Sequence, residues 1–203
     1  MKTVAVLLPL LAFGAAGVGL ANSGSDRDPV RVVVETSMGS FELDVDVDRA
    51  PVTANNFLRY VDGGLYDGGS FFRTVHGANQ PTDSIRIAVV QGGRSPAAAV
   101  ESFPPIPLER TRQTGILHTD GAVSMARGGP DTATHSFFIC IGDQPSLDYG
   151  GMRNPDGQGF AAFGRVVDGM EVVRAIHRAP YEAQQLTPAV EIVRVYRKMS
   201  GGP

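Results

Sequence analysis

FELDVDVD, residues 41–48, alternates strictly between apolar and acidic side chains. This period of two places the apolar residues on one face of the backbone and the carboxylates on the other, which is typical of a half-buried antiparallel strand. The β-branched segment at residues 30–36 precedes it, and Ser37-Met38-Gly39 supplies a turn between the two. The chain is therefore predicted to open its folded part with a β-hairpin.

Two later stretches have helical periodicity. The first follows Pro51, with Thr53 as the expected N-cap, and Gly63-Gly64 ends it. The second covers residues 168–178, where Met170, Val172, Val173 and Ile176 form an apolar stripe. Both are predicted to be amphipathic helices that pack on the rest of the fold.

From residue 70 onward, short apolar runs alternate with glycine and proline. These runs lie at residues 70–75, 85–91, 121–126, 136–141, 160–167 and 190–197. The chain holds 25 glycines, and neither an internal repeat nor a domain linker is visible in it. Many short strands with two helices predict one mainly β domain, either a closed barrel or a sandwich with helices over its ends.

The N-terminal residues have the pattern of a targeting segment. Residues 4–20 carry no charge, follow Lys2, and lead into the small residues of Gly19-Leu20-Ala21. This pattern predicts a cleaved signal peptide and an exported, periplasmic protein, with a membrane anchor over residues 4–20 as the alternative if cleavage does not occur. The predicted division is a signal peptide at 1–21, a flexible leader at 22–29, the folded domain at 30–198 and a flexible tail at 199–203.

Composition argues against several function classes. The net charge is −3 and the basic residues are scattered, so no nucleic-acid surface is expected. Cys140 is the one cysteine, so an internal disulfide is excluded, and its position in an apolar run argues against a redox role. The four histidines share no ligand spacing, so neither a metal site nor a cofactor is predicted.

Several motifs occur in a fixed order along the predicted domain. They are FFRTV at 71–75, VVQGG at 89–93, GAVSMAR at 121–127, GPDT at 129–132 with SFFIC at 136–140, LD at 147–148, FGRV at 163–166 and DGM at 168–170. In this order they resemble the cyclophilin family of peptidyl-prolyl cis–trans isomerases. The resemblance implies a closed eight-stranded antiparallel barrel capped by two α-helices, with a substrate groove on its outer surface.

The resemblance also implies roles for individual residues. Arg73 would be catalytic and donate a hydrogen bond to the proline nitrogen in the twisted transition state, and Gln91 would orient it. The substrate-binding residues would be Phe138, Leu147, Val89, Ala126, Arg127 and Phe160. The chemistry requires neither a nucleophile nor a metal. The implied partners are proline-containing segments of unfolded or flexible exported proteins, bound by a monomer.

Four positions and one segment depart from the family pattern. Ala88 stands where the family usually has Phe, Ser136 where it has Gln, Ser146 where a large residue is common, and Phe160 where a His aligns. Phe160 could supply the apolar wall that Ala88 lacks. Residues 76–87 form a longer connection than is usual. These departures keep open an alternative function, a proline-peptide binding module or holdase chaperone with weak or no catalysis.

Overall fold

The computed structural model describes residues 1–2, 28–95 and 102–199. The predicted signal peptide, apart from its first two residues, lies outside the described part, as do most of the predicted leader and most of the predicted tail. Across the described ranges, no helix has both the length and the apolar character needed to span a membrane.

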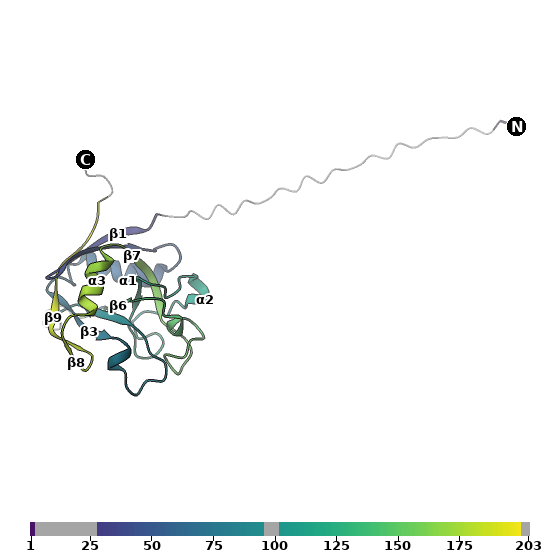
Figure 1. Ribbon diagram of the computed structural model, residues 1–203. Helices are drawn as coiled ribbons and strands as arrows, with labels where there is room; N and C mark the ends of the chain where they lie inside the picture. The colour runs from purple at the N-terminus through teal and green to yellow at the C-terminus, as the bar shows by residue number, and fades with distance from the viewer. Residues whose placement is uncertain (3–27, 96–101, 200–203) are drawn as a thin grey trace.

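The described strands form one antiparallel sheet that closes on itself (Figure 1). The neighbour order is β1-β2-β7-β5-β6-β4-β3-β9, and a pairing between β1 and β9 completes the barrel. Its strands are β1 (Val30–Thr36), β2 (Gly39–Val45), β3 (Gly69–Val75), β4 (Val89–Gly93), β5 (Ala122–Met125), β6 (Phe137–Cys140), β7 (Ala161–Asp168) and β9 (Gln185–Arg197). The two-residue strand β8 (Tyr181–Glu182) pairs only with β9. The prediction of a closed eight-stranded antiparallel barrel is confirmed.

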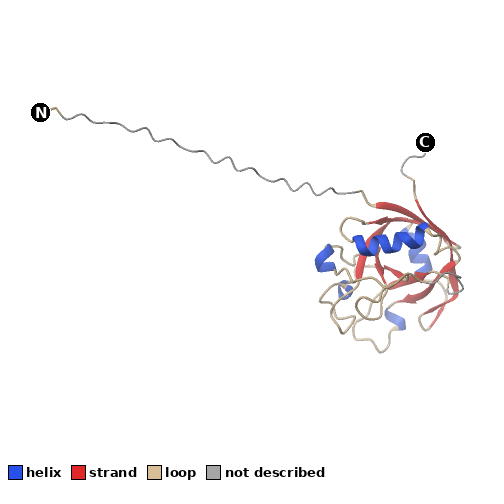
Figure 2. Ribbon diagram, turned by 180° about the vertical axis from the view of Figure 1, so that it is seen from behind, coloured by secondary structure: helices blue, strands red, loops and turns tan. Residues whose placement is uncertain are grey.

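Two helices close opposite ends of the barrel (Figures 1 and 2). Helix α1 (Pro51–Asp62) packs near β7 and β9, and α3 (Met170–His177) packs near β2, β3 and β4. A short helix that the sequence did not indicate, α2 (Thr111–Thr114), lies in the connection before β5, and 3-10 turns cover Gly77–Asn79 and Pro145–Leu147. The two predicted helices are therefore present, together with this short addition.

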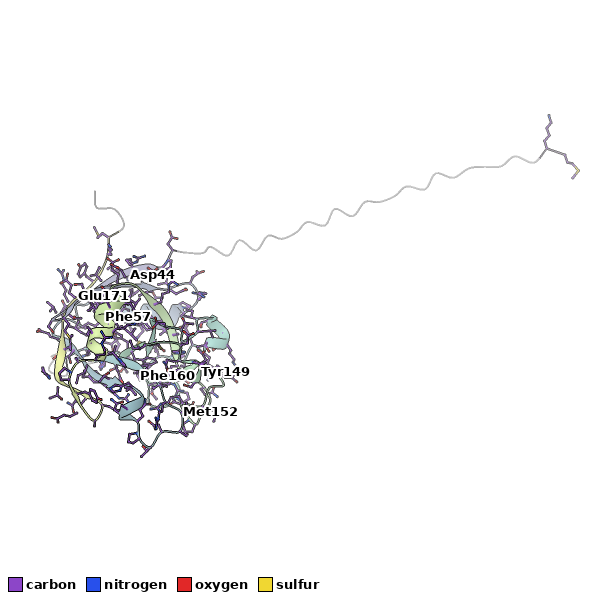
Figure 3. All side chains as sticks on the ribbon, in the orientation of Figure 1. Asp44, Phe57, Tyr149, Met152, Phe160 and Glu171 are labelled. Atoms are coloured by element: carbon purple, nitrogen blue, oxygen red, sulfur yellow. The ribbon has the colours of Figure 1, made fainter. Side chains whose placement is uncertain are left out.

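Aromatic side chains fill the barrel interior. Phe57 projects from α1 into contact with three rings, at centroid distances of 5.3 Å to Tyr66, 5.5 Å to Phe137 and 5.1 Å to Phe163 (Figure 3). All four side chains are fully buried. Each buried aromatic side chain contributes several kcal/mol to folding, on the order of 3–5 kcal/mol by truncation to Ala. The core therefore anchors the strands whose outer faces are described below.

The opening hairpin agrees with the predicted alternation, but it is shorter. Phe41, Leu43 and Val45 are buried, and the strand then ends. The expected continuation to residue 48 is wrong because Asp46 accepts a hydrogen bond from the Arg49 backbone N–H, 2.8 Å, and so turns the chain. Acidic residues that alternate with valine can form a turn as readily as a strand when one carboxylate caps the backbone.

The predicted cap of α1 is also wrong. The helix begins at Pro51, which favours the first helical position, and this places Thr53 inside the first turn. The Glu109 carboxylate accepts from the backbone N–H groups of Val52 and Thr53 at 3.1 and 2.7 Å. The Thr53 hydroxyl is buried and has no hydrogen-bond partner among the described residues. A distant acid therefore performs the capping that was expected of Thr53.

Glu109→Ala should destabilise the fold without changing it. Two helix N–H groups would lose a charged acceptor, which costs about 1 kcal/mol, or roughly 2–4 °C in the unfolding midpoint of a domain of this size. Thermal unfolding followed by circular dichroism measures the shift, with Glu109→Gln as the variant that keeps one acceptor. An unchanged midpoint for Glu109→Ala would show that solvent replaces the cap.

Candidate active site on the outer face of the barrel

A second apolar cluster lies outside the barrel, on the outward face of β3, β4, β5 and β6. We call it the outer cluster. Its buried members are Val75, Ile87, Val89, Ala122, Phe138, Cys140 and Leu147, with Ala126 and Phe160 partly exposed against them. Strand alternation explains it, because neighbours such as Val90 and Ile139 point inward to the core. Five of the eight predicted site residues meet here: Val89, Phe138, Leu147, Ala126 and Phe160.

Aromatic rings shape this cluster. Phe160 meets Phe138 edge to face, with ring centroids 5.3 Å apart and planes at 89°. His118 stacks on Phe138 at 6.0 Å and 14°. Phe138 is 4% exposed, whereas Phe160 is partly exposed toward the same edge of the molecule as Tyr149 and Met152 (Figure 3). The arrangement leaves Phe160 as an apolar wall beside a nearly buried ring.

A β-bulge brings Arg73 to the same outer face. Phe71 pairs with Gly92, and Arg73 pairs with Gln91, so β3 has one more residue than β4 between these pairs. Phe71 is fully buried in the core. On a regular strand Arg73, two residues later, would also point inward; the extra residue reverses the alternation and turns Arg73 outward.

The strand register then aligns the polar and apolar parts of the site. Gln91 on β4 is the partner of Arg73 on one side and of Phe138 on the other. Phe138 is in turn the partner of Ser124 on β5. Because neighbouring strands lie about 4.8 Å apart, Arg73 and Phe138 belong to a single row across the sheet, roughly 10 Å apart at the backbone.

Two carboxamide side chains hold the guanidinium of Arg73. Its Nη1 donates to Gln91 Oε1 at 3.0 Å. Its Nε and Nη2 both donate to Gln184 Oε1, at 3.0 and 2.6 Å. Gln184 was missed in the sequence, since it is 111 positions away in a connection without a recognisable pattern. The structure thus places Gln91 where it was expected and adds a second acceptor.

The charge of Arg73 has no carboxylate against it. Within the described ranges, no ion pair includes Arg73. Burial lowers the pKa of the Arg73 guanidinium, nearby Arg153 lowers it further, and Asp83 opposes them. Arginine nevertheless stays protonated in proteins at working pH. Arg73 is therefore a half-buried cation whose field is available to a bound molecule.

Arg127 turns its side chain away from the row and into the following loop. Its guanidinium donates to the Gly159 carbonyl at 2.8 and 2.5 Å and pairs with both oxygens of Asp156 at 2.8 and 3.0 Å. The guanidinium carbon also lies 5.0 Å from the centre of the Phe160 ring. The side chain is 1% exposed. These contacts of Arg127 hold in place the loop that carries Phe160.

A buried polar chain supports Phe138 from behind. Asp148 Oδ1 lies 2.7 Å from His118 Nδ1, and His118 Nε2 lies 3.0 Å from the Ser124 hydroxyl. Ser124 is fully buried and His118 is 1% exposed. Such a chain fixes the plane of the imidazole and so the ring stacked on it. Sequence reasoning did not assign these residues, since their partners come from three separate segments.

The departures from the family pattern are accommodated locally. The Ala88 backbone N–H donates to Gln144 Oε1 at 3.1 Å, and Phe160, not residue 88, supplies the aromatic wall. In the longer connection at 76–87, the buried Gln80 side chain exchanges hydrogen bonds with the Ile87 backbone at 2.7 and 3.2 Å. Residues 85–88 were expected to begin a strand, but β4 starts at Val89. The reason is that the N–H and the carbonyl of Ile87 are hydrogen-bonded to the Gln80 side chain and cannot pair with a neighbouring strand.

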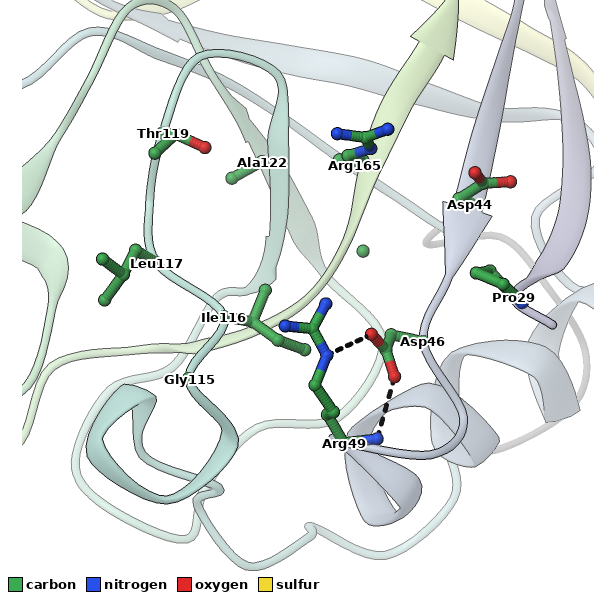
Figure 4. Close-up of a pocket in the computed structure, with 11 residues that line it drawn as sticks. Pro29, Asp44, Asp46, Arg49, Gly115, Ile116, Leu117, Thr119, Ala122 and Arg165 are labelled. Carbon is green, nitrogen blue, oxygen red and sulfur yellow. Dashed lines mark hydrogen bonds and ion pairs between the residues drawn. The ribbon is translucent and has the colours of Figure 1, made fainter. Parts of the chain in front are cut away.

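A hollow of about 490 Å³ lies on another part of the surface, between β2, β7 and residues 115–119 (Figure 4). Arg49 and Asp46 form an ion pair of 2.6 Å inside it, and Leu117 is at its edge. It shares only Ala122 with the outer cluster. Four of its lining side chains are charged, Asp44, Asp46, Arg49 and Arg165, which distinguishes it from the apolar outer cluster.

Comparison with known proteins identifies the arrangement. The family model described as cyclophilin type peptidyl-prolyl cis-trans isomerase/CLD matches residues 31–197. Peptidyl-prolyl cis-trans isomerase A of Dickeya dadantii is 33% identical over 183 residues, covering 90% of this chain and 85% of the relative. The peptidyl-prolyl cis-trans isomerase of Acinetobacter baylyi is 30% identical over 204 residues, covering 98% and 96%.

The fold is also shared with a solved structure. The cyclophilin type peptidyl-prolyl cis-trans isomerase of Cryptosporidium parvum, solved in the presence of the dipeptide Ala-Pro, gives a TM-score of 0.67 at 18% identity. The match covers 84% of this chain and 99% of that one. At this identity the likeness concerns the fold.

Arg127→Ala should loosen the Phe160 loop while leaving the barrel intact. The Gly159 carbonyl and Asp156 would lose their shared donor, so the backbone amide of Phe160 should exchange with solvent at least several-fold faster. Hydrogen exchange measured by NMR tests this. Arg194→Ala is the matched control, since Arg194 also lies over a ring, 5.0 Å from the centre of Tyr196, but on β9, which does not pair with this loop. Equal exchange in both variants would contradict the assignment.

Proposed function

The chain belongs to the cyclophilin-type peptidyl-prolyl cis–trans isomerase family, and from that premise we propose that Arg73 carries its isomerase activity by donating a hydrogen bond to the substrate's proline nitrogen. The observation that carries the proposal is the geometry of one residue. Arg73 is a cation without a carboxylate partner, in the same cross-strand row as the aromatic cluster around Phe138.

The reaction needs a donor that acts only in the transition state. Amide resonance opposes rotation about an X–Pro bond with a barrier of roughly 18–20 kcal/mol. At a right angle the resonance is lost, and the proline nitrogen gains a free lone pair. A fixed donor aimed at this nitrogen finds an acceptor only in the twisted state, so it stabilises the transition state and not the ground state.

The remaining residues divide the work of holding the substrate. We propose that Phe138, Leu147 and Val89 receive the proline ring, with Phe160 as the wall that Arg127 fixes. The backbone at Ala126 and Arg127 would hydrogen-bond the residue before proline. Immobilising the ring while the preceding residue turns is what an apolar, tightly packed cluster can do. Arg73 also borders a hollow of about 370 Å³ together with Phe72 and residues 182–185, which supports its accessibility.

The proposed substrates are proline-containing segments of exported proteins. Residues 4–20 carry no charge and end near Ala21, which supports secretion and cleavage ahead of the leader. We propose that the mature domain assists folding outside the cytoplasm, in the periplasm, as a monomer, where slow X–Pro exchange limits folding on a timescale of tens to hundreds of seconds.

Arg73→Ala should lower kcat/KM by about 10–100-fold while peptide affinity is nearly kept. A charge-assisted hydrogen bond is worth roughly 1.5–3 kcal/mol, and each 1.36 kcal/mol is about tenfold in rate. Arg73→Lys should recover little, because an ammonium cannot reproduce the planar donor array. Phe138→Ala should instead reduce binding and rate together. A protease-coupled assay on an X–Pro peptide, with isothermal titration for affinity, makes the measurement.

Wild-type activity that survives in Arg73→Ala would overturn the catalytic assignment. An inactive wild type that still binds proline peptides would favour the alternative, a binding module or holdase chaperone, for which the replacements at Ala88 and Ser136 are the first residues to revert.

N-terminal sequencing of the protein from its native cell should begin near Asn22. Signal peptidase cleaves after small residues, and Gly19 and Ala21 occupy the positions it reads. Cell fractionation should place the same product outside the cytoplasm. A mature chain that begins at Met1 in the cytoplasmic fraction would contradict export.

A further inference from the structure

Both side chains that hold Arg73 are neutral. Gln91 accepts one hydrogen bond and Gln184 accepts two, and neither brings a negative charge to the guanidinium. Arginines this deeply placed are commonly paired with carboxylates, because a buried cation needs compensation. At Arg73 the hydrogen bonds are satisfied while the charge is not neutralised.

We propose that Gln184 is a positioning residue of the isomerase, which fixes the orientation of the Arg73 guanidinium and, being a neutral carboxamide, leaves its positive charge free to act on the substrate. The proposal rests on the proposed function of Arg73 and adds to it the residue that orients the catalytic donor.

The number of donors supports this assignment. A guanidinium has five N–H groups in one plane. Gln184 Oε1 accepts from Nε and from one N–H of Nη2, which fixes rotation of the plane, and Gln91 accepts from Nη1. Two N–H groups then remain, one on each terminal nitrogen. Arg73 thus keeps donors for a substrate after its orientation has been set by the protein.

Gln184 is itself held at both ends. Its Nε2 donates to the Asn79 carbonyl at 3.1 Å, and its backbone carbonyl accepts from the Thr74 N–H at 2.9 Å. The preceding residue, Ala183, has φ of 54°, which closes the tight turn between β8 and β9. Of the two strands, β9 lies beside β3 in the sheet (Figure 1). The carboxamide oxygen is therefore fixed relative to the strand that carries Arg73.

Neutrality at position 184 has a physical reason. A carboxylate there would accept the same two donors as a bidentate ion pair, and it would draw the guanidinium and its field away from the proline nitrogen. The cation of Arg153 also lies near Arg73 and pairs with Asp83 at 3.0 Å. Two carboxylates are close by, Asp83 and Glu182, and Glu182 lines the same hollow. Neither forms an ion pair with Arg73.

The experiment compares three variants of the mature full-length protein with wild type and with Arg73→Ala. Gln184→Leu removes the acceptor oxygen at similar size, and Gln184→Glu keeps an acceptor for the same two donors and adds charge. Gln113→Leu is the matched control, because Gln113 is an exposed carboxamide in α2 that accepts one hydrogen bond, from the Arg110 backbone N–H, away from Arg73. Cis–trans exchange of an X–Pro peptide is followed by NMR exchange spectroscopy, which needs no coupling protease and works at acid pH. Peptide affinity is measured in parallel.

Gln184→Leu should lower kcat about tenfold, as expected for loss of orientation of one charged donor, with peptide affinity within about twofold of wild type. Gln184→Glu should be similarly slow at pH 7. Arg73 would hold the pKa of the introduced carboxyl below its ordinary value, and protonation below that pKa removes the charge. Its activity relative to wild type at the same pH should therefore rise as the pH falls. Gln113→Leu should match wild type.

Each failure has its own meaning. Full activity in Gln184→Leu, with Arg73→Ala inactive, overturns the positioning role. Full activity of Gln184→Glu at pH 7, or a loss that does not recover in acid while circular dichroism reports a folded protein, overturns the requirement for neutrality. Retained activity in Arg73→Ala instead rejects the proposed function itself. If Gln184→Glu unfolds in acid, its activity at pH 7 and the Gln184→Leu variant decide the matter.

Discussion

Phe71 points into the barrel, and on a regular strand Arg73 would point the same way, because side chains two residues apart share a face. The extra residue of β3 between the Phe71–Gly92 and Arg73–Gln91 pairs removes that conflict. Before the bulge the strand supplies the core aromatic Phe71, and after it Arg73 and Val75 face outward. Thr74 between them is buried, and its hydroxyl donates a hydrogen bond to the His177 carbonyl. The bulge therefore lets one seven-residue strand serve both the core and the site.

The partial burial of the Arg73 side chain on the outer face of the barrel costs folding free energy. Its guanidinium loses part of its hydration, and no carboxylate among the described residues compensates it directly. Three hydrogen bonds to carboxamide oxygens offset part of this cost. An ion pair would offset more, but it would reduce the field that the proposed catalytic role of Arg73 requires. Neutral partners therefore stabilise the fold less than a carboxylate would, but they leave the positive charge of Arg73 available to a substrate.

Sequence reasoning recovered those parts of the molecule that depend on local pattern. Alternation at 41–45 and the motif order along the chain were sufficient to predict the barrel, and the motifs named five of the residues that meet in the outer cluster. It failed where the physical partner is distant. Glu109 caps α1 from 56 and 57 positions away, and Gln184 reaches Arg73 across 111. Neither residue carries a local signal, since a lone Glu or Gln in a connection has many possible partners. The bulge was equally hidden, because FFRTV contains no residue that marks the extra position.

The β8–β9 hairpin links closure of the barrel to the orientation of Arg73. Strand β9 pairs with β1 near its end, which closes the sheet, and with β3 near its start, where Gln185 is opposite Arg73. Gln184 immediately precedes this start, so the segment that completes the barrel also places the Gln184 carboxamide against Arg73. Two of the three hydrogen bonds of the Arg73 guanidinium therefore depend on this segment, while the third goes to Gln91 on β4. The proposed catalytic geometry is thus a property of the completed fold, and a local rearrangement of β8 and β9 would disturb the orientation of Arg73 before it disturbed the aromatic core around Phe57.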